Sequence, residues 1–579
     1  MVHQRIPRPE HPRPQLFRER WQNLNGWWEF EIDHGRSGKD RKFYERKELS
    51  GKILVPFCPE SKLSGVEYRD FVAAVWYRRE FELPPGWGEG NRVLLHFEAV
   101  DYYTEVWING VSVGSHRGGF TPFTFDITDH LVAGTNVLTV CAEDDVRSGL
   151  QPVGKQSTLY HSHATKYTRT TGVWQTVWLE CVAEGYVDSL RYFPDPANGQ
   201  LHIAAKLAGN VVGCDLQLTA SYEGKPMGSV TARVVGPDVR VTLPLDEVHL
   251  WEPGKPRLYD LAIVLSKDSY PLDEVQSYFG LRTITLDDRA ILINGQPVFQ
   301  RLVLDQGYYP DGVYTAPTDE ALRKDIELSM ELGFNGARLH QKVFERRFLY
   351  WADKLGYLVW GEYPNWGLDI TTAKGLEVFL PQWLEAVERD FNCPALVVWC
   401  PFNETWDWYG NRQNNEVLRN IYLVTKQLDP TRPVIDTSGN YHVVTDIFDI
   451  HDYEQDVEVF AKRYQKVAET GEVYVTFPDR QKYGGQPYFV SEYGGIWWSD
   501  TGDEGWGYGR RPKDKEEFLA RYKGLTEALL NNPLVAGFCY TQLYDVEQEM
   551  NGLYTYGREP KFDKEVIRQI NQQRAAIEE

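Results

Sequence analysis

The sequence is poor in cysteine, and its few cysteines are not arranged in pairs. Seven occur among 579 residues, and an odd number cannot be fully paired. The seven are Cys58, Cys141, Cys181, Cys214, Cys393, Cys400 and Cys539. They show neither a C-x-x-C pair nor a spacing typical of a zinc site. We therefore expect reduced, mostly buried thiols, which argues against a disulfide framework.

Long apolar runs and a secretory signal are also missing. No stretch approaches the roughly 20 apolar residues that are needed to cross a bilayer. Residues 1–30 are rich in Pro, Arg and His and lack the apolar centre of a signal peptide. Hydrophobic residues make up 42% and charged residues 25% of the chain, as is usual for soluble globular proteins. These features predict a cytoplasmic protein without a membrane partner.

Positive charge is scarce, whereas aromatic residues are abundant. The formal net charge of −21 argues against a nucleic-acid partner, because Lys and Arg drive binding to phosphate backbones. Aromatic residues make up 14% of the chain, with 19 Trp and 34 Tyr. Flat rings with polar tips suit stacking on sugars, although large cores also use them. The composition favours a carbohydrate partner only weakly.

Length and pattern together predict three domains, since a domain usually holds about 100–200 residues, or about 250 in an α/β barrel. Residues 1–183 show an all-β pattern, with short alternating runs at 75–83 and 104–108. The block 184–284 is again β-rich, and its length fits an immunoglobulin-like β-sandwich. Exposed sandwich faces would also allow a homo-oligomer.

From residue 285 to 579, short apolar strands alternate with helices, which indicates parallel strands joined by helical crossovers. One helix is predicted to begin after an N-cap at Thr318, and another covers about 514–531. The candidate strands are 298–305, 334–340, 357–362, 396–403, 434–438, 448–453, 488–492 and 534–542. Eight strands at this length predict a catalytic (β/α)8 TIM barrel.

Two glutamates stand where such a barrel carries its chemistry, at the C-terminal ends of strands. Glu404 follows the fourth candidate strand, and Glu492 ends the seventh. These strands face each other across the barrel mouth. A retaining glycosidase needs two carboxyl groups about 5–5.5 Å apart, one protonated and one ionised. The pair therefore predicts a retaining glycosidase.

The motifs around both residues resemble those of glycoside hydrolase family 2. Residues 399–404 (WCPFNE) resemble its acid/base motif, and 491–494 (SEYG) resemble its nucleophile motif. The family has the same domain order, so the resemblance implies a jelly-roll β-sandwich over 1–183. It further implies that Glu404 is the acid/base and Glu492 the nucleophile of an exo-acting enzyme.

The resemblance also implies roles for residues beside the pair. Asn403 would hold the sugar 2-hydroxyl, Tyr453 would donate a hydrogen bond to the nucleophile, and Arg338 would keep the nucleophile ionised, because a nearby cation favours a carboxylate. Further candidates for substrate contacts lie at other strand ends, with core packing or a surface charge as the general alternative and a salt bridge to Arg338 as the alternative for Glu362. These are Asp305, His340, Glu362, Trp366 and Trp406.

The sequence departs from the family in ways that bear on metal and sugar. Around Glu362 it does not reproduce the magnesium ligands of the larger β-galactosidases, so we expect neither metal nor cofactor. Uronide-specific members carry an Asn-x-Lys loop, where this chain has Glu547 and Glu549. Because two acids would repel a uronate, we expect a neutral sugar, most simply a β-D-galactoside.

Other specificities stay open, because loops rather than the fold select the sugar. They are α-L-arabinofuranosidase, β-galactofuranosidase, β-mannosidase and β-glucuronidase. A transglycosylase would share the covalent intermediate. A non-catalytic carbohydrate-binding protein is the alternative from another class, although such a protein would not need both glutamates.

Overall fold

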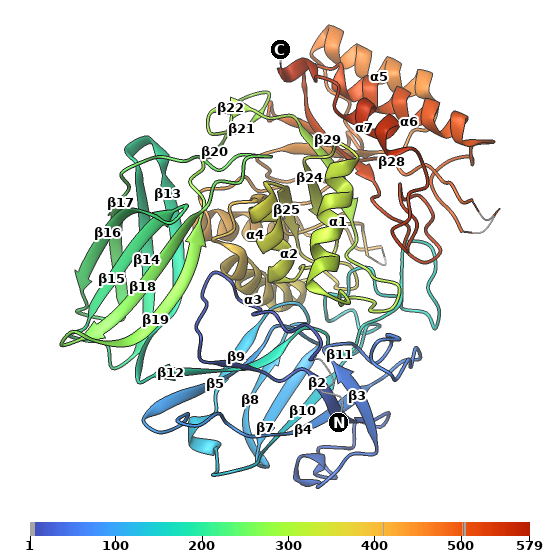
Figure 1. Cartoon of the computed structure of the whole chain (residues 1–579). Helices are drawn as coiled ribbons and strands as arrows, with labels where there is room; N and C mark the ends of the chain where they lie inside the picture. Colours follow the sequence, from blue (N-terminus) through green and yellow to red (C-terminus); the bar gives the residue numbers. More distant parts are fainter. Residues whose placement is uncertain (1–5, 409, 501, 503–504, 579) are drawn as a thin grey trace.

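The computed structural model describes residues 6–408, 410–500, 502 and 505–578. Figure 1 shows two β-sheet bodies, blue and green, packed against a mixed α/β body that runs from yellow to red. This arrangement confirms the predicted fold class of two β-sandwiches followed by an α/β barrel. All seven cysteines are buried and free, as expected.

The N-terminal domain is a sandwich of antiparallel sheets. Its strands are β1 (Trp21–Asn23), β2 (Gly26–Ile32), β3 (Gly51–Val55), β4 (Ala74–Phe81), β5 (Asn91–Phe97), β6 (Val100–Asp101), β7 (Tyr103–Ile108), β8 (Val111–Arg117), β9 (Phe123–Asp126), β10 (Asn136–Glu143), β11 (Gly172–Val173) and β12 (Val177–Ala183). One sheet has the order β3-β2-β4-β10-β7-β8 and the other β1-β12-β5-β9. Their facing side chains, among them Trp28, Val75, Leu95 and Leu179, share one apolar core.

The middle domain is a smaller sandwich with a core of its own. Its strands are β13 (Gly185–Asp195), β14 (Gln200–Gly209), β15 (Asp215–Tyr222), β16 (Lys225–Arg233), β17 (Asp238–Pro244), β18 (Tyr259–Lys267) and β19 (Tyr270–Phe279). The sheets have the orders β13-β14-β17 and β16-β15-β18-β19. In β14, Leu201, Ile203, Ala205 and Leu207 point into the core at every second position, as the pleat requires.

A small sheet of β20 (Ile284–Leu286), β21 (Ile291–Ile293) and β22 (Gln296–Pro297) leads into the barrel. The barrel strands are β23 (Gln300–Asp305), β24 (Gly336–Leu339), β25 (Leu358–Glu362), β26 (Leu396–Cys400), β27 (Phe448–Asp452), β28 (Tyr488–Gly494) and β29 (Val535–Thr541). They form a parallel sheet in the order β26-β25-β24-β23-β29-β28-β27. Seven of the candidate strands thus correspond to strands of this sheet.

The expected strand at 434–438 is wrong as a regular strand. Only isolated parallel bridges, Trp399 to Val434 and Asn403 to Ser438, connect this segment to β26 and the residues after it. The side chain of Asp436 accepts hydrogen bonds from the backbone of Val443 and Val444, which ties the segment to its own loop. The segment therefore lies where the fifth strand of a barrel belongs, but without a continuous ladder.

Helices follow the strands and cover the outside of the barrel (Figure 1). They are α1 (Asp319–Glu331), α2 (Arg346–Leu355), α3 (Ala373–Asp390), α4 (Asn415–Leu428), α5 (Val457–Thr470), α6 (Lys515–Leu530) and α7 (Lys564–Asn571). Both helices expected from the sequence are confirmed: Thr318 caps α1 by accepting from Ala321 N, and Asp514 caps α6. Among the helices of the described residues, none is both long and apolar enough to cross a membrane.

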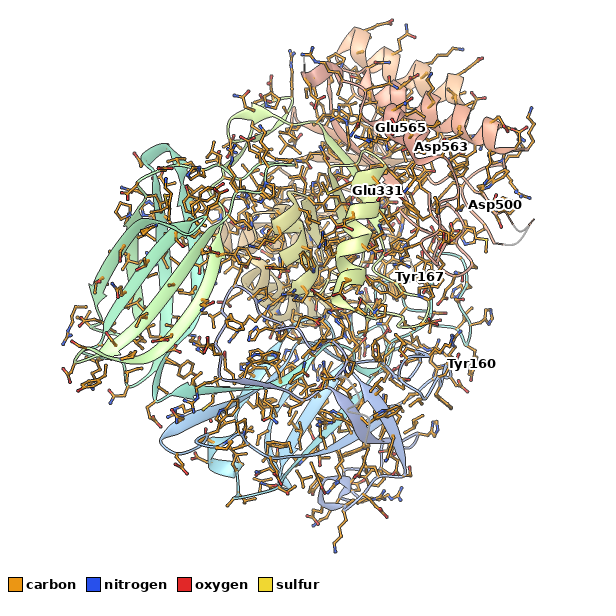
Figure 2. The ribbon with its side chains drawn as sticks, in the orientation of Figure 1. Tyr160, Tyr167, Glu331, Asp500, Asp563 and Glu565 are labelled. Carbon is orange, nitrogen blue, oxygen red and sulfur yellow. The ribbon has the colours of Figure 1, made fainter. Side chains whose placement is uncertain are left out.

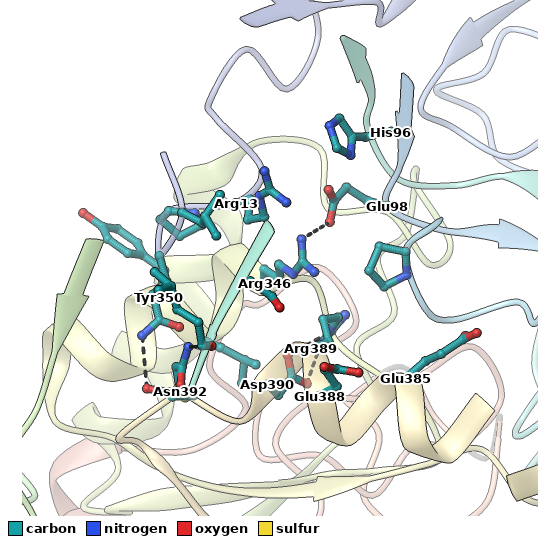
Figure 3. A pocket seen from close by; sticks show the side chains of 18 of the residues that line it. Arg13, His96, Glu98, Arg346, Tyr350, Glu385, Glu388, Arg389, Asp390 and Asn392 are labelled. Atoms are coloured by element: carbon teal, nitrogen blue, oxygen red, sulfur yellow. Dashed lines mark hydrogen bonds and ion pairs between the residues drawn. The ribbon is translucent and has the colours of Figure 1, made fainter. Parts of the chain in front are cut away.

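The three domains meet around a cavity of about 390 Å³ (Figure 3). Its lining includes His96 from the first domain, Ser189 from the second, and Glu385 from the barrel. Arg346 of α2 approaches Glu98 of the first domain to 3.2 Å across this junction. Neither Glu404 nor Glu492 is among the described residues that line this cavity, so the cavity is separate from the barrel mouth.

Candidate active site

The acidic strand ends predicted from the sequence converge at the barrel mouth. Arg338 lies in β24, Glu362 ends β25, Glu404 follows β26, and Glu492 lies in β28. Because all these strands are parallel, their C-terminal ends meet at one rim. Glu362 and Glu492 are buried, whereas the side chain of Glu404 keeps 18% of its surface exposed. Glu404 is thus the more accessible of the two paired carboxylates.

His451 of β27 joins the two carboxylates. Its Nδ1 donates to Oε1 of Glu404 at 2.7 Å and lies 3.4 Å from Oε2 of Glu492. One ligand atom from each of the three residues lies within 4.8 Å of the others. This short spacing suits a retaining mechanism, because an inverting pair stands about 6.5–9.5 Å apart.

The ring of His451 is fixed from behind. Its Nε2 lies 3.1 Å from Oγ of Ser438, and that hydroxyl also donates to Asp449 at 2.5 Å. A Cβ at Gly439 would lie 2.4 Å from the imidazole, so only glycine fits there. The segment 436–439 therefore serves as the backing for His451.

Glu404 sits in an unusual backbone conformation. Its φ of +45° lies in the left-handed region, which residues other than glycine rarely adopt. A hydrogen bond of 2.9 Å from its backbone N–H to the carbonyl of Ser438 holds this conformation. Backbone strain of this kind is often found at functional sites, where the surrounding structure enforces it.

Arg338 organises the buried half of the site. Its guanidinium has no exposed surface and contacts Glu362 at 2.8 Å, Glu492 at 3.3 Å and Oδ1 of Asn403 at 2.9 Å. Burial alone would raise the pKa of Glu362, but the charge of Arg338 outweighs it and lowers that pKa to about 2. His340 binds the other oxygen of Glu362 at 3.0 Å. Arg338 is therefore balanced by two carboxylates.

Tyr453 holds Glu492 from the opposite side. Its hydroxyl donates to Oε2 of Glu492 at 2.5 Å and lies 3.0 Å from Oγ1 of Thr541. The ring of Tyr508 stacks on that of Tyr453, with centroids 3.5 Å apart. Glu492 is thus fixed by a cation on one oxygen and a hydroxyl on the other.

Glu404 and His451 influence each other's pKa. Burial raises the pKa of Glu404, but the hydrogen bond from His451 and its charge outweigh burial and lower it to about 2. For His451 the order is reversed: burial lowers its pKa, and the charge of Glu492 and the hydrogen bond to Glu404 raise it overall. The proton between Glu404 and His451 therefore rests on the imidazole in the unliganded site.

Of the remaining predicted residues, Trp366 and Trp406 contact Asn403 and Glu404, whereas the carboxylate of Asp305 binds elsewhere. The indole of Trp366 donates to the carbonyl of Asn403 at 3.0 Å, and the half-exposed Trp406 lies 3.3 Å from Glu404. Asp305 is buried at 2% exposure, and its backbone carbonyl accepts from His340 N at 2.8 Å. Its carboxylate accepts from Gly307 N and from the hydroxyl of Tyr544. Asp305 therefore stabilises the loop after β23.

Three residues at the site had no assigned role in the sequence argument. His451 lies in β27 and Tyr508 in the loop after β28, and no catalytic motif in the sequence includes them. Lys155 comes from the first domain, where the barrel pattern could not predict a site residue. The charge of Lys155 acts on both Glu404 and His340. Glu404, His451 and Glu492 also have the ligand types that Zn²⁺ accepts, so a divalent cation would compete with the shared proton.

A barrel with two carboxylates at its mouth, preceded by two β-sandwiches, defines a class of multidomain glycosidases. Residues 21–150 match the sugar binding domain of glycosyl hydrolases family 2, 197–282 match a second domain of that family, and 284–508 match its TIM barrel domain. The chain belongs to glycoside hydrolase family 2.

Curated relatives carry two activities in their names. A β-galactosidase from Thermoanaerobacter pseudethanolicus is 27% identical over 406 residues, which cover 67% of this chain and 52% of the relative. A β-glucuronidase from Sus scrofa is 28% identical over 470 residues, 74% of this chain and 70% of the relative. The match thus spans about half the length of the β-galactosidase.

Similar solved structures include two bacterial β-glucuronidases. That of an uncultured Clostridium sp. has a TM-score of 0.79 at 22% identity, and covers 96% of this chain and 98% of its own. That of Bifidobacterium dentium has a TM-score of 0.80 at 21% identity, with coverages of 96% and 97%. These likenesses show that the three-domain fold is shared almost from end to end.

Proposed function

We propose that the chain hydrolyses terminal glycosides with retention, with Glu492 as nucleophile and Glu404 as acid/base. The observation that carries the proposal is the different support of two adjacent carboxylates. Arg338 and Tyr453 stabilise negative charge on Glu492, whereas Glu404 shares a proton with His451. One carboxylate is thus prepared to attack and the other to transfer a proton.

The reaction proceeds in two displacements. Glu492 bonds to the anomeric carbon while the bond to the leaving oxygen breaks, and that oxygen takes the proton delivered through Glu404. Water then attacks the same carbon, Glu404 accepts its proton, and the bond to Glu492 breaks. In both steps the proton crosses the 2.7 Å hydrogen bond between Glu404 and His451.

Asn403 is oriented to bind the sugar. Its Oδ1 accepts from Arg338, and its backbone is held on both sides by Asn365, at 2.9 and 3.0 Å. Its amide nitrogen has no partner among the described residues and is left to donate to a hydroxyl, as a 2-hydroxyl contact requires. Such a contact strengthens as the oxocarbenium-like transition state forms.

For the sugar, we favour a β-D-glucuronide over the neutral sugar that the sequence alone suggested. Most of the relatives found are named β-glucuronidases. The argument from two repelling acids is also weaker than expected. Glu549 is buried and accepts from Tyr167 and Asn551, and Glu547 accepts from the backbone of Thr168. A β-D-galactoside is the second candidate, supported by the relative of that name.

The test is a panel of 4-nitrophenyl glycosides. The β-glucuronide and β-glucoside form the key pair, because they differ only at C6, which is a carboxylate in one and a hydroxymethyl group in the other. The β-galactoside, β-mannoside, α-L-arabinofuranoside and β-galactofuranoside complete the panel. We expect release from the β-glucuronide, with the β-anomer as first product by NMR. An α-anomer would exclude retention, and a folded protein without turnover on any member would contradict the hydrolase.

His451→Gln is expected to move the alkaline limb of kcat/KM to lower pH by about one unit or more. In the wild type the shared proton is held by an imidazole, whose ordinary pKa is about 6.5 and is raised here. The active, protonated form of the site persists up to the raised pKa of His451, so activity is lost as the pH rises through that pKa. In the variant a carboxyl with an ordinary pKa of about 4.3 must hold the proton.

The pH profile of the best panel substrate provides the measurement for His451. His202→Gln is the matched control, because His202 lies on the exposed face of β14, far from the barrel mouth in sequence and fold. A uniform loss of activity with an unshifted limb would show that His451 only supports the structure.

A further inference from the structure

The segment 144–171, between β10 and β11, leaves the first domain and lies on the barrel mouth. The backbone N–H groups of Val153 and Gly154 donate to the carbonyl of Trp366 at 2.7 and 2.9 Å. Farther along the segment, Gln548 donates to the carbonyl of Lys166 at 2.9 Å. In Figure 2, Tyr167 lies at the junction with the barrel and Tyr160 at the outer edge of the molecule. The segment is therefore hydrogen-bonded to the barrel at two places, near Gly154 and near Lys166.

The sequence is adapted to this close contact. Gly154 has a φ of +66°, and a Cβ there would lie 2.5 Å from the carbonyl oxygen of Gln341 and 2.8 Å from Pro364. Only glycine allows the backbone to approach the barrel so closely. The next residue, Lys155, is consequently buried against the ring of Trp366.

Lys155 and Lys166 form a pair of cations on one aromatic ring. Their Nζ atoms lie 4.4 and 4.5 Å from the centroid of the Trp366 ring. Lys155 is only 5% exposed, and among the described residues its ammonium makes no hydrogen bond and no ion pair. Lys166 donates to the carbonyl of Gly154 at 2.7 Å, but it too has no carboxylate partner there. A cation as buried as Lys155 is normally paired with an anion, and Lys166 beside it is only partly exposed.

The pair faces the reaction centre. The indole of Trp366 donates to the carbonyl of Asn403, the residue before Glu404. The charge of Lys155 acts on Glu404, His340 and Glu549, which follow the barrel strands β26, β24 and β29 in the sequence. Burial and the charge of Lys155 lower the pKa of Lys166 well below its ordinary value, as expected for two neighbouring cations that lack an anion.

We infer that Lys155 and Lys166 bind the carboxylate of an acidic sugar, so that the first domain, and not the barrel alone, determines specificity. The inference rests on the proposed hydrolysis and adds to it the residues that select the substrate. Two ammonium groups over one ring offer several N–H donors to a carboxylate. The position of the Asn-x-Lys loop is taken by Glu547, Gln548 and Glu549, and the same three residues hold this lysine-bearing segment in place.

The kinetic test compares Lys155→Met, Lys166→Met and the double variant on 4-nitrophenyl β-glucuronide and β-glucoside. We expect kcat/KM for the glucuronide to fall roughly 30- to 100-fold in each single variant and further in the double variant, mainly through KM. Activity on the glucoside should change less than about threefold. Lys155→Arg should recover part of the glucuronide activity, and Lys225→Met, an exposed lysine of the middle domain, should match the wild type.

Equal losses on both substrates would mean that the lysines only support the structure, and this would overturn the inference. An unchanged glucuronide activity, or a wild type that prefers the neutral sugar, would overturn it as well while leaving the retaining hydrolase intact.

A binding experiment tests this inference independently of the proposed hydrolysis. D-Glucaro-1,5-lactone, a ligand of a similarly folded Ruminococcus gnavus β-glucuronidase, is the anionic probe, and D-glucono-1,5-lactone is its neutral counterpart. Calorimetry on the full chain should show that the double variant loses at least about tenfold in affinity for the anionic lactone only. This result would support the lysine site even if no glycoside were hydrolysed, and equal affinities of wild type and double variant for the anionic lactone would overturn it.

Discussion

Glu492→Ala is expected to lower kcat on an activated aryl glycoside by roughly 10⁴-fold or more, because it removes the atom that bonds to the anomeric carbon. The loss should be similar for good and poor leaving groups, since the first displacement needs the nucleophile in every case. Arg338 and Tyr453 cannot compensate, because they contact the carboxylate of Glu492 and stabilise the charge that the variant lacks.

Azide gives the Glu492 variant a distinctive product. A small anion can enter the space left by the carboxylate and attack from the same face, and the product is then the glycosyl azide of inverted configuration. Glu416→Gln is the matched control, since Glu416 is exposed on α4 and its side chain retains 71% of its surface. Wild-type turnover by Glu492→Ala would refute the assignment of the nucleophile.

Sequence alone predicts the parts of this site that depend on local pattern. Glu404 follows a short apolar strand and Glu492 ends another, and parallel strands bring their ends to one rim wherever a barrel closes. Arg338 could be placed for the same reason, because it lies in β24. The same kind of pattern gave a wrong prediction for the fifth strand. Residues 434–438 have an apolar start, but Asp436 bonds to its own loop and interrupts the ladder.

The parts that sequence could not predict depend on tertiary contacts. His451 takes its role from its distance to two carboxylates on other strands, and no motif encodes that distance. Lys155 lies far from Glu404 in sequence and reaches the site only because Gly154 lets the segment rest on the barrel. Tertiary contacts also changed the argument about the sugar. The sequence predicted that Glu547 and Glu549 would repel a uronate, but in the fold both carboxylates accept hydrogen bonds from the segment 144–171.

Glu404→Ala should separate the two chemical steps. Without the acid, substrates with poor leaving groups should lose roughly 10²- to 10⁴-fold in kcat/KM, the usual contribution of general acid catalysis. Aryl glycosides whose phenol has a low pKa need little protonation and should lose far less. Because Glu404 also activates the water of the second displacement, the glycosyl-enzyme should accumulate with these good substrates. A burst of phenol release in pre-steady-state kinetics would reveal it.

External azide completes the assignment of Glu404. With Glu404 removed and Glu492 intact, azide attacks the covalent intermediate, so the glycosyl azide should form with retained configuration and turnover of activated substrates should rise. This is the opposite stereochemistry to that expected for Glu492→Ala. The same product configuration in both variants would contradict the division of roles between the two carboxylates. Retained azide from Glu404→Ala and inverted azide from Glu492→Ala would assign each carboxylate independently, because azide replaces the base-activated water in one variant and the nucleophilic carboxylate in the other.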